Sequence, residues 1–484
     1  MKPNPHLLLK NERGTIRKSH AGKLRIALVY PNSYSVGMSN LAVHTLYRTF
    51  NARNEIVCER FFYDRSRYAV LPQSFESGTP LSGFDIIASS LSFELDYFNL
   101  VALLKRAEIP MLRSERTARS PFILAGGIAI SANPEPLADI VDAVVLGEAE
   151  EIITPILDIL LNTSAIHNQN SKLLKELSEL PGIYIPKLMP SAEHLSRLHV
   201  QELDRYPTVS QIITPNTEFK NMFLIELGRG CPYHCRFCLA GSFYRPVRYR
   251  SLNHIYEQLK LARELTETKT YPRVGIVATA IADYPQLDEL CEEMLRKKIA
   301  VSFASLRADK APVRLLQLLK QSGQKTVTFA PEAGSESLRK SIGKPISDAQ
   351  LVDMVERTVR FGLLNIKLYF MLGLPNETES DIIALIALVK KLRDVFISAS
   401  KPLGRVGKLI VAVNPFVPKK GTRFEHERFG SVLVLRDKMN RIRAGLKKEH
   451  NLQLQFTSPN LAELEAELSL GSRNLAQKLY HSKH

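Results

Sequence analysis

Short apolar runs alternate with amphipathic stretches through the first third of the chain. Leu41, Leu46 and Phe50 recur at helical spacing, and the stretches 97–109 and 150–162 are also helix-like. Around them stand four apolar runs, at 24–31, 84–92, 121–127 and 140–148. This alternation predicts a parallel sheet with helices on both faces, a doubly wound, Rossmann-like α/β domain over 24–161.

A second alternating series begins further along the chain. Its apolar runs lie at 222–230, 273–281, 299–309, 325–334, 365–375 and 408–416, each followed by a helix-like stretch. Six strands with intervening helices predict a partial (β/α)6 barrel over 219–420, with its chemistry at the carboxyl ends of the strands. Residues 1–23 form a basic leader, the polar, proline-rich stretch 162–218 a connector, and 421–484 a basic helical region.

Composition narrows the class of protein. The 484 residues are too many for one core, and 45% hydrophobic with 24% charged residues is ordinary for a globular chain. No apolar run approaches the roughly 18–20 residues of a membrane span, and the leader does not have the form of a secretory signal. Five cysteines, three of them clustered, do not make a disulfide framework, so we expect a reducing, cytoplasmic location.

The net charge is strongly positive, with 65 Lys and Arg against 49 Asp and Glu, or +16. Part of the excess lies in the leader, from Lys2 onward, and part in RDKMNRIRAGLKKEH near the end of the chain. Such a balance suits an anionic substrate, a nucleic acid or an acidic membrane surface. Well-solvated basic faces explain it equally, because no recognised RNA-binding module accompanies the charge.

The stretch RGCPYHCRFCLAG contains Cys231, Cys235 and Cys238, which follow the first strand of the second series. A structural zinc ion normally takes four protein ligands, and an iron–sulfur cube also has four corners. Three cysteines therefore leave one iron open to another ligand, although a zinc or redox loop remains an alternative. We expect Cys58 and Cys291 to be buried thiols, and His234 to pack or face solvent rather than bind metal.

The spacing CxxxCxxC, with Phe237 before the third cysteine, resembles the signature of the radical S-adenosylmethionine enzymes. The resemblance implies a [4Fe-4S] cluster whose open iron chelates the amino and carboxylate groups of S-adenosylmethionine. One electron, from a donor such as flavodoxin or ferredoxin, then cleaves the sulfonium and yields a 5′-deoxyadenosyl radical. Cys231, Cys235 and Cys238 are thus the expected metal ligands and part of the catalytic set.

Other segments resemble the same family. In APEAGSESLRKSIGKPI, the resemblance places Glu332 near the ribose or amino group of S-adenosylmethionine. Arg307 could pair with its carboxylate. The family's second-strand glycine–glycine–glutamate is absent and ATAIADYP stands in its place, so backbone or Asp283 would make that contact.

YFMLGLPNETESD resembles the segment that cradles the adenine. The resemblance implies backbone contacts at Gly373, Leu374 and Pro375, with Glu377 capping the turn. Tyr369 stands where the family usually has its first glycine. Lys367 and Tyr369 could face the substrate as proton or hydrogen-atom partners, or could simply pack.

Almost the whole chain resembles a subfamily with an amino-terminal cobalamin-binding-type domain and no assigned reaction. Glycines close two strands of the first domain, and Gly126, Gly127, Ser131, Gly147 and Glu148 occupy places where such domains contact cobalamin. Glycine is also common in any tight turn after a strand. The Asp-x-His-x-x-Gly motif that supplies a lower histidine ligand is missing, so binding of cobalamin and recognition of substrate alone both remain open.

Several other polar residues are candidates. Glu94 and Asp96 are possible acid–base groups or helix caps. Arg245, Arg248 and Arg250 suit an anionic substrate, or neutralisation of the cluster's thiolates.

We therefore predict a radical S-adenosylmethionine enzyme. With cobalamin, the expected reaction is methyl transfer to an unreactive carbon; without it, rearrangement, oxidation or sulfur insertion. Methylthio transfer is disfavoured, because such enzymes carry three further cysteines where this chain has Cys58 alone. The alternative from another class is an RNA- or partner-binding iron–sulfur protein.

Overall fold

The computed structural model describes residues 5–64, 71–268 and 270–481, which fall into two units. Unit 1 comprises Met1–Ile225, Glu257–Thr270 and Leu468–His484, and unit 2 comprises Glu226–Tyr256 and Tyr271–Glu467, in each case as far as these residues are described. The division differs from the expected boundaries, because leader and connector belong to unit 1 and unit 2 extends past residue 420. Lys2 of the leader lies outside the described residues.

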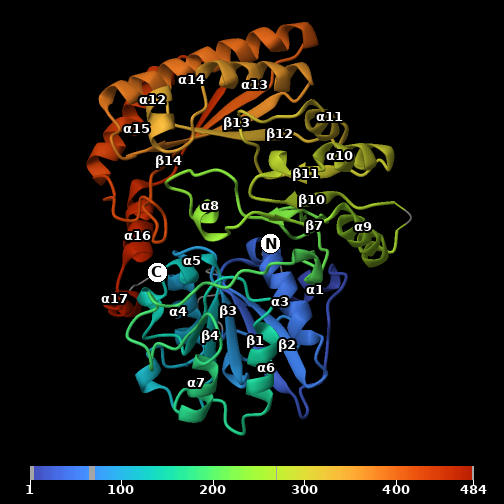
Figure 1. Cartoon of the computed structure of the whole chain (residues 1–484), viewed down its shortest axis with the longest axis vertical. Helices are drawn as coiled ribbons and strands as arrows, with labels where there is room; N and C mark the ends of the chain where they lie inside the picture. Colours follow the sequence, from blue (N-terminus) through green and yellow to red (C-terminus); the bar gives the residue numbers. More distant parts are fainter. Residues whose placement is uncertain (1–4, 65–70, 269, 482–484) are drawn as a thin grey trace. The chain divides into compact units, whose positions relative to one another are not determined.

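Unit 1 contains the expected doubly wound sheet (Figure 1). Its strand order is β2-β1-β3-β4-β5-β6, and every pairing is parallel except that of β5 with β6. The strands are β1 (Leu24–Tyr30), β2 (Ile56–Phe62), β3 (Ile86–Ser90), β4 (Phe122–Gly126), β5 (Ala143–Val145) and β6 (Ile183–Tyr184). The order reverses between β1 and β3, and the crevice beyond the carboxyl ends at such a point is where doubly wound sheets bind ligands.

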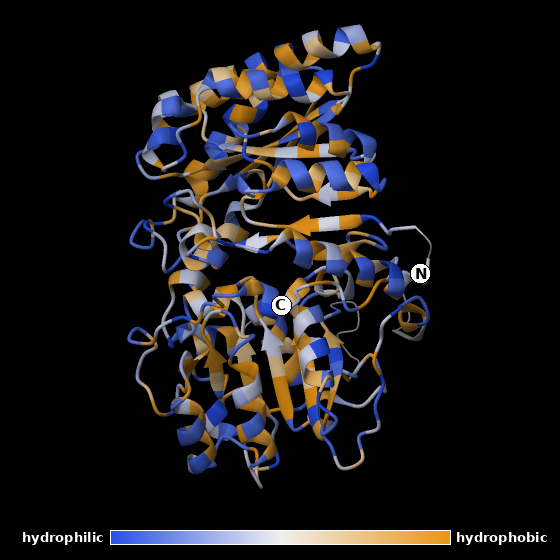
Figure 2. Cartoon of the chain, turned by 45° about the vertical axis from the view of Figure 1, so that its right-hand side comes forward, coloured by the Kyte–Doolittle hydropathy of each residue, from blue (hydrophilic) through white to orange (hydrophobic). Residues whose placement is uncertain are grey.

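Helices cover this sheet with their apolar faces inward. Hydrophobic colour concentrates on the strands, whereas the helices show both colours (Figure 2). The predicted helices form as α3 (Leu41–Asn51), α4 (Asp96–Arg106) and α6 (Ile153–Leu161). The remaining helices of the unit are α1 (Pro5–Lys10), α2 (Tyr34–Gly37), α5 (Ile128–Ala132), α7 (Ser171–Ser178) and α17 (Leu475–His481).

Strand β2 is not predicted by the sequence pattern because charged residues interrupt its apolar run. Glu59 and Arg60 stand in the middle of IVCERFF, yet they are 3% and 0% exposed. Each has a partner, since Glu59 lies 2.8 Å from His20 and Arg60 is bound by two carboxylates. A charge that is paired in this way can occupy a buried strand. The sequence pattern also misses α7, because this short helix lies within the polar stretch 162–218 that the pattern predicts to be a connector.

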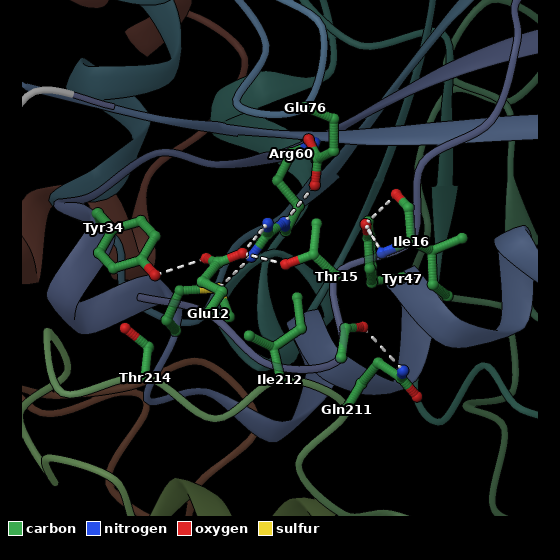
Figure 3. Close-up of polar contacts among 12 residues, drawn as sticks. Glu12, Thr15, Ile16, Tyr34, Tyr47, Arg60, Glu76, Gln211, Ile212 and Thr214 are labelled. Atoms are coloured by element: carbon green, nitrogen blue, oxygen red, sulfur yellow. Dashed lines mark hydrogen bonds and ion pairs between the residues drawn. The ribbon is translucent and has the colours of Figure 1, made fainter. Parts of the chain in front are cut away.

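The partners of Arg60 show that the leader is part of the core of unit 1 (Figure 3). The guanidinium of Arg60 binds Glu12 of the leader at 2.7 Å and Glu76 at 2.6 Å, and these side chains are all at most 1% exposed. Tyr34 donates its hydroxyl to Glu12 at 2.5 Å. Leu8 of α1 packs into the same apolar core. The leader is therefore not merely a solvated basic extension.

Unit 2 contains the later strands of the second series, and β10 pairs with β11, and β12 to β15 pair with one another, in parallel. One sheet has the order β12-β13-β14-β15, and a shorter one has the order β11-β10-β7. A parallel bridge between Leu306 and Phe329 connects the β11 segment to β12. The strands are β7 (Phe223–Glu226), which crosses the unit boundary, β10 (Val274–Val277), β11 (Val301–Phe303), β12 (Thr326–Glu332), β13 (Asn365–Leu372), β14 (Lys408–Pro415) and β15 (Leu452–Phe456), with the small pair β8 (Gly228–Arg229) and β9 (Arg248–Tyr249).

The helices of unit 2 follow the strands in turn. They are α8 (Leu239–Phe243), α10 (Leu287–Arg296), α11 (Val313–Gln321), α12 (Glu336–Ser341), α13 (Asp348–Arg360), α14 (Glu379–Ser400) and α15 (Val432–Leu446). α9 (Leu252–Thr266) and α16 (Pro459–Leu470) cross the unit boundary. Strand β15 is not expected in the basic helical region; its five residues are all half-buried or exposed, so they lack an apolar run. No helix in the described ranges is both long and apolar enough to span a membrane.

Candidate functional site

The three-cysteine loop lies between β8 and α8 in unit 2. Cys231, Cys235 and Cys238 are free and partly buried. Cys238 is the N-cap residue of α8, and its sulfur accepts a hydrogen bond from the Gly241 N–H at 3.3 Å. His234 is exposed, whereas Cys58 and Cys291 are each 1% exposed, as expected for buried thiols.

The turn after α12 packs against the backbone of the cysteine loop and makes a hydrogen bond to it. Arg236 donates its N–H to the Ile342 carbonyl at 2.9 Å. Gly343 has φ +77°, and a Cβ there would lie 2.5 Å from the carbonyl oxygen of His234. Only glycine allows this approach without strain, so Gly343 determines how closely the turn can support the loop. Sequence reasoning does not single it out.

An apolar cluster connects the loop with the ends of three strands. Phe237 and Met371 pack against Ala333, Leu338, Ile342, Leu374, Phe416 and Phe424. These residues follow or end β12, β13 and β14. Two residues that the sequence singles out, Phe237 and Leu374, are thus brought to one place at the carboxyl ends of the strands.

Two cations lie close to the thiols. Burial raises the pKa of Cys235, and the neighbouring charges of Lys344 and Arg307 work against that rise. Lys344 lies 2.8 Å from Glu332, the last residue of β12. Glu332 has φ +72° and follows a register shift between β12 and β13. A non-glycine residue in this conformation is strained, and such strain is concentrated at functional sites.

Arg307 and Asp283 both contact Tyr233, the tyrosine of the cysteine loop. The Arg307 guanidinium lies 3.6 Å from the centre of the Tyr233 ring, and Tyr233 donates its hydroxyl to Asp283 at 2.9 Å. Asp283 also pairs with Lys310. Its second carboxylate oxygen is buried and has no hydrogen-bond partner among the described residues. An unsatisfied buried acceptor beside the cysteine loop is a feature that a ligand can satisfy.

The turn after β13 is closed by a carboxylate of the chain. Gly373 has φ +80°, and its N–H donates to the Glu377 carboxylate at 3.0 Å. Lys438 of α15 pairs with the same carboxylate. Leu374 is 4% exposed, and Pro375 follows it in the turn. Glu377 therefore closes the turn.

Lys367 and Tyr369 lie on one face of β13. Buried and half-buried residues alternate strictly along this strand, and both residues belong to the half-buried set. The Lys367 ammonium lies 4.8 Å from the centre of the Tyr369 ring. α13 and α14 lie on one side of the sheet in Figure 1, and the buried residues such as Leu368 and Phe370 belong to the core.

Of the three arginines after the cysteines, two donate to backbone carbonyls and the third pairs with a carboxylate. Arg245 donates to the carbonyls of Tyr233 at 2.6 Å and Gly241 at 2.8 Å. Arg248 donates to the Pro246 carbonyl at 3.0 Å, and Arg250 pairs with Glu226 at 2.7 Å. Arg245 thus holds both ends of the cysteine loop, and these contacts give the three arginines a structural role beside the cluster site.

The donor set fits an iron–sulfur cube better than a single ion. Among the described residues no three His, Cys, Asp or Glu side chains form a group that could hold one metal ion. A cube asks each cysteine for a separate corner, and three thiols on one loop with two cations nearby meet that need. A closed structural zinc site would need a fourth ligand.

In unit 1, the residues predicted to contact cobalamin lie at the carboxyl ends of β4 and β5, where the chain's own backbone fills the space. A Cβ on Gly127 would clash with the Leu91 carbonyl oxygen, and one on Gly147 with that of Leu198. The hydroxyl of Ser131, in α5, donates to the carbonyl of Val145 at the end of β5, at 3.2 Å. The Glu148 carboxylate accepts from the Val200 N–H at 2.9 Å. Gly126 is less confined, since its nearest such contact is 3.8 Å away.

A different polar group lies at the reversal point between β1 and β3. Asp96, the first residue of α4, is 2% exposed, and the N-cap position before it makes no side-chain capping bond. One carboxylate oxygen of Asp96 accepts from Asn32 at 2.8 Å and Asn99 at 3.4 Å, while the other is buried without a hydrogen-bond partner among the described residues. Burial raises the pKa of Asp96 to about 6, although the two amides oppose the rise. The alternative role of Asp96 as a helix cap is therefore not observed.

Both ring nitrogens of the histidine in α3 already make hydrogen bonds to the backbone. His44 lies 3.1 Å from the Met38 carbonyl through Nε2, and its Nδ1 accepts from Gln211 at 3.2 Å. Burial lowers the pKa of His44 to about 4, so the ring is neutral. His44 therefore cannot serve as a ligand without breaking these bonds.

Two family models match the chain. The model for radical SAM proteins, N-terminal, matches residues 42–186, and the radical SAM superfamily model matches residues 225–389. A protein of Methanocaldococcus jannaschii is 32% identical over 464 residues, covering 95% of this chain and 91% of the relative. The chain belongs to the radical S-adenosylmethionine superfamily. It is an enzyme of this superfamily, whose members use a [4Fe-4S] cluster and S-adenosylmethionine.

Two further comparisons concern methyltransferases. The bacteriochlorophyllide d C-8(2)-methyltransferase of Chlorobaculum tepidum is 22% identical over 361 residues, 71% of each chain. The radical S-adenosylmethionine methyltransferase TsrM of Kitasatospora setae, solved with cobalamin and a [4Fe-4S] cluster bound, has a TM-score of 0.56 at 12% identity. That similarity covers 95% of this chain and 99% of TsrM, and it shows a shared fold.

Proposed function

We propose that Cys231, Cys235 and Cys238 hold the [4Fe-4S] cluster and that S-adenosylmethionine binds beside it, at the carboxyl ends of β12 and β13. When bound, the cluster supplies one electron that cleaves the sulfonium of S-adenosylmethionine to methionine and a 5′-deoxyadenosyl radical. The observation that carries this proposal is the convergence of Phe237, Glu332, Leu374 and Gly373 with the cysteine loop in one unit.

The residues around the cysteine loop each have a role in binding the cluster or S-adenosylmethionine. Lys344 and Arg307 offset the negative charge of the thiolates, and Phe237 with the apolar cluster excludes water from them. The unpartnered oxygen of Asp283 accepts from the amino group of S-adenosylmethionine, in place of the missing glycine–glycine–glutamate. Glu377 holds the Gly373 turn against the adenine.

We further propose that the reaction is methyl transfer to an unreactive carbon, with cobalamin bound in unit 1. Cobalamin, when bound, supplies the methyl group. The support is the buried, unpartnered oxygen of Asp96 at the reversal point of a doubly wound sheet, where an amide or hydroxyl of a bound ligand would satisfy it.

Retention of cobalamin tests this second proposal. Full-length protein with a reconstituted cluster is incubated with hydroxocobalamin and passed over a gel-filtration column, and the retained absorption spectrum is recorded. Wild type should retain cobalamin, and Asp96→Asn should bind about 10–100-fold more weakly, the cost of one hydrogen bond to a charged group. Asp85→Asn, at the opposite end of β3 next to Arg25, is the matched control and should bind as wild type does. Folded wild type that retains no cobalamin would refute methyl transfer from cobalamin.

A further inference from the structure

A basic groove lies between α15, which is labelled in Figure 1, and β15, the edge strand of the β12-β13-β14-β15 sheet. It has a volume of ≈ 610 Å³ and is lined by Arg443, Ala444, Lys447, Leu454 and Phe456. Two of these residues are cationic and three are apolar, and none is acidic. The groove does not include any of the residues proposed to bind the cluster or S-adenosylmethionine.

Its cationic wall is a stripe along one face of α15. Arg436, Arg443 and Lys447 are spaced seven and four residues apart, which places them on the same side of a helix. Contacts show that this side of α15 faces β15 and the start of α16. Arg436 donates to Asn460 of α16 at 2.8 Å, and the Arg443 guanidinium lies over the ring of Phe456 in β15. From Arg436 to Lys447 the stripe is about 16 Å long, at 1.5 Å per residue.

The acidic residues of the same segment point elsewhere. Residues 432–456 contain six Lys and Arg and two Asp and Glu, a net charge of +4. Asp437 lies 3.8 Å from Arg441, and Glu449 lies 3.2 Å from Arg393 and 3.7 Å from Lys390 of α14. Arg443 and Lys447 are exposed, so their charge is left for a ligand.

The β15 wall contributes an aromatic ring, over which a guanidinium of the α15 wall lies. The Arg443 guanidinium lies 4.2 Å from the centre of the half-buried Phe456 ring. Proteins that bind single-stranded nucleic acid combine a positive groove for the backbone with aromatic rings or arginine planes on which bases stack. An acidic protein partner would use the charge but would have no need of the stacked pair.

We propose that this groove binds single-stranded RNA, with phosphates on the α15 stripe and a base on the Arg443–Phe456 pair. This inference is independent of the radical chemistry and of cobalamin. Single-stranded RNA is then the macromolecule that the enzyme binds, and part of the +16 net charge serves this binding.

The test is fluorescence anisotropy of a labelled oligouridylate with the full-length protein at several salt concentrations. The variant Arg443→Gln/Lys447→Gln should bind at least about 10-fold more weakly, and its slope of log K against log salt should be less steep by about 1.4, or 0.7 for each lost phosphate contact. Phe456→Leu should lose about 5–100-fold in affinity while the salt slope stays unchanged, because stacking is not ionic.

The control variant removes the same charge elsewhere. Lys298→Gln/Lys325→Gln changes two exposed lysines on the β11 and β12 side of unit 2 and should bind as wild type does. Three results would overturn the proposal: no binding by wild type, an equal loss in the control, or displacement of the RNA by a poly-glutamate peptide at equal affinity. 5′-Deoxyadenosine formation in the Arg443→Gln/Lys447→Gln variant should be unchanged, so this test fails or succeeds separately from the proposed function.

Discussion

Both units contain tight glycine turns against which another segment packs, after strands in unit 1 and after helix α12 in unit 2. In unit 1, the space beside Gly127 and Gly147 is filled by the backbone of Leu91 and Leu198. In unit 2, the space beside Gly343 admits the cysteine loop, whose thiols are still partly accessible. A glycine in a tight turn therefore indicates close approach of another segment, and only the structure shows whether that segment is the cysteine loop or another stretch of backbone.

The polar groups differ in the same way. In unit 1 the predicted contacts Ser131 and Glu148 are bound to the backbone, whereas Asp96, the first residue of α4, has one of the buried oxygens without a partner among the described residues. In unit 2, Asp283 accepts a hydrogen bond from Tyr233 of the cysteine loop, and its other oxygen is one of the buried atoms without a partner among the described residues. The two proposed ligand contacts therefore rest on buried polar atoms without partners rather than on glycine motifs.

The largest expected effect comes from the cysteine loop itself. Cys235→Ala should lower the affinity for cluster iron by more than about 100-fold, because loss of an outer-shell partner alone costs about 10–100-fold. Iron and sulfide analysis after anaerobic reconstitution measures this. Cys291→Ala, which removes a buried thiol from α10, is the control and should keep full iron content. A full cluster in Cys235→Ala would contradict the assignment of the ligands.

Arg60→Met should destabilise unit 1 strongly without altering the cluster. Removing the guanidinium leaves Glu12 and Glu76 buried without their cation, at a cost of about 3–5 kcal/mol in the free energy of unfolding. Urea denaturation is the measurement. Arg53→Met breaks a largely exposed pair with Asp158 and should cost about 0–1 kcal/mol. Equal effects of the two changes would disprove the burial of the network.

Asp96→Asn should remove a pH dependence of stability. Because burial raises the pKa of Asp96 from 3.8 to about 6, the folded state binds this proton more tightly than the unfolded state does. Stability from this group is therefore complete below about pH 4 and is lost as the pH rises to about 6, a change of about 3 kcal/mol. Between pH 4.5 and 8, wild type should lose more stability than Asp96→Asn; identical profiles would show that Asp96 ionises normally.

The smallest expected effects separate the two kinds of glycine turn. Gly343→Ala and Gly127→Ala each force a side chain into a positive-φ conformation and should cost about 1–2 kcal/mol. Only Gly343→Ala should also reduce the iron content, since its Cβ would press on His234 of the cysteine loop. If Gly127→Ala lowered iron equally, the distinction between the two turns would not hold.

Much of the fold could be predicted from the sequence, because apolar runs mark strands that are buried on both faces. The failures have physical causes: β2 has its charges neutralised by residues far away in the sequence, and β15 is half-exposed. In the candidate site, the cysteine spacing directed attention to the three thiols, and the family resemblance directed it to the Gly373 turn. It could not identify Gly343 or the missing partner of Asp96, because close approach and unmade hydrogen bonds exist only in three dimensions.

The most direct test of the proposed chemistry is the cleavage of S-adenosylmethionine by the full-length protein. The protein is purified without oxygen, its cluster is reconstituted, and it is incubated with S-adenosylmethionine and dithionite before the products are separated. Wild type and Cys291→Ala should form 5′-deoxyadenosine, and Cys235→Ala should form none. Wild type that holds iron and sulfide in full yet forms no 5′-deoxyadenosine would contradict the proposal that this site generates the radical.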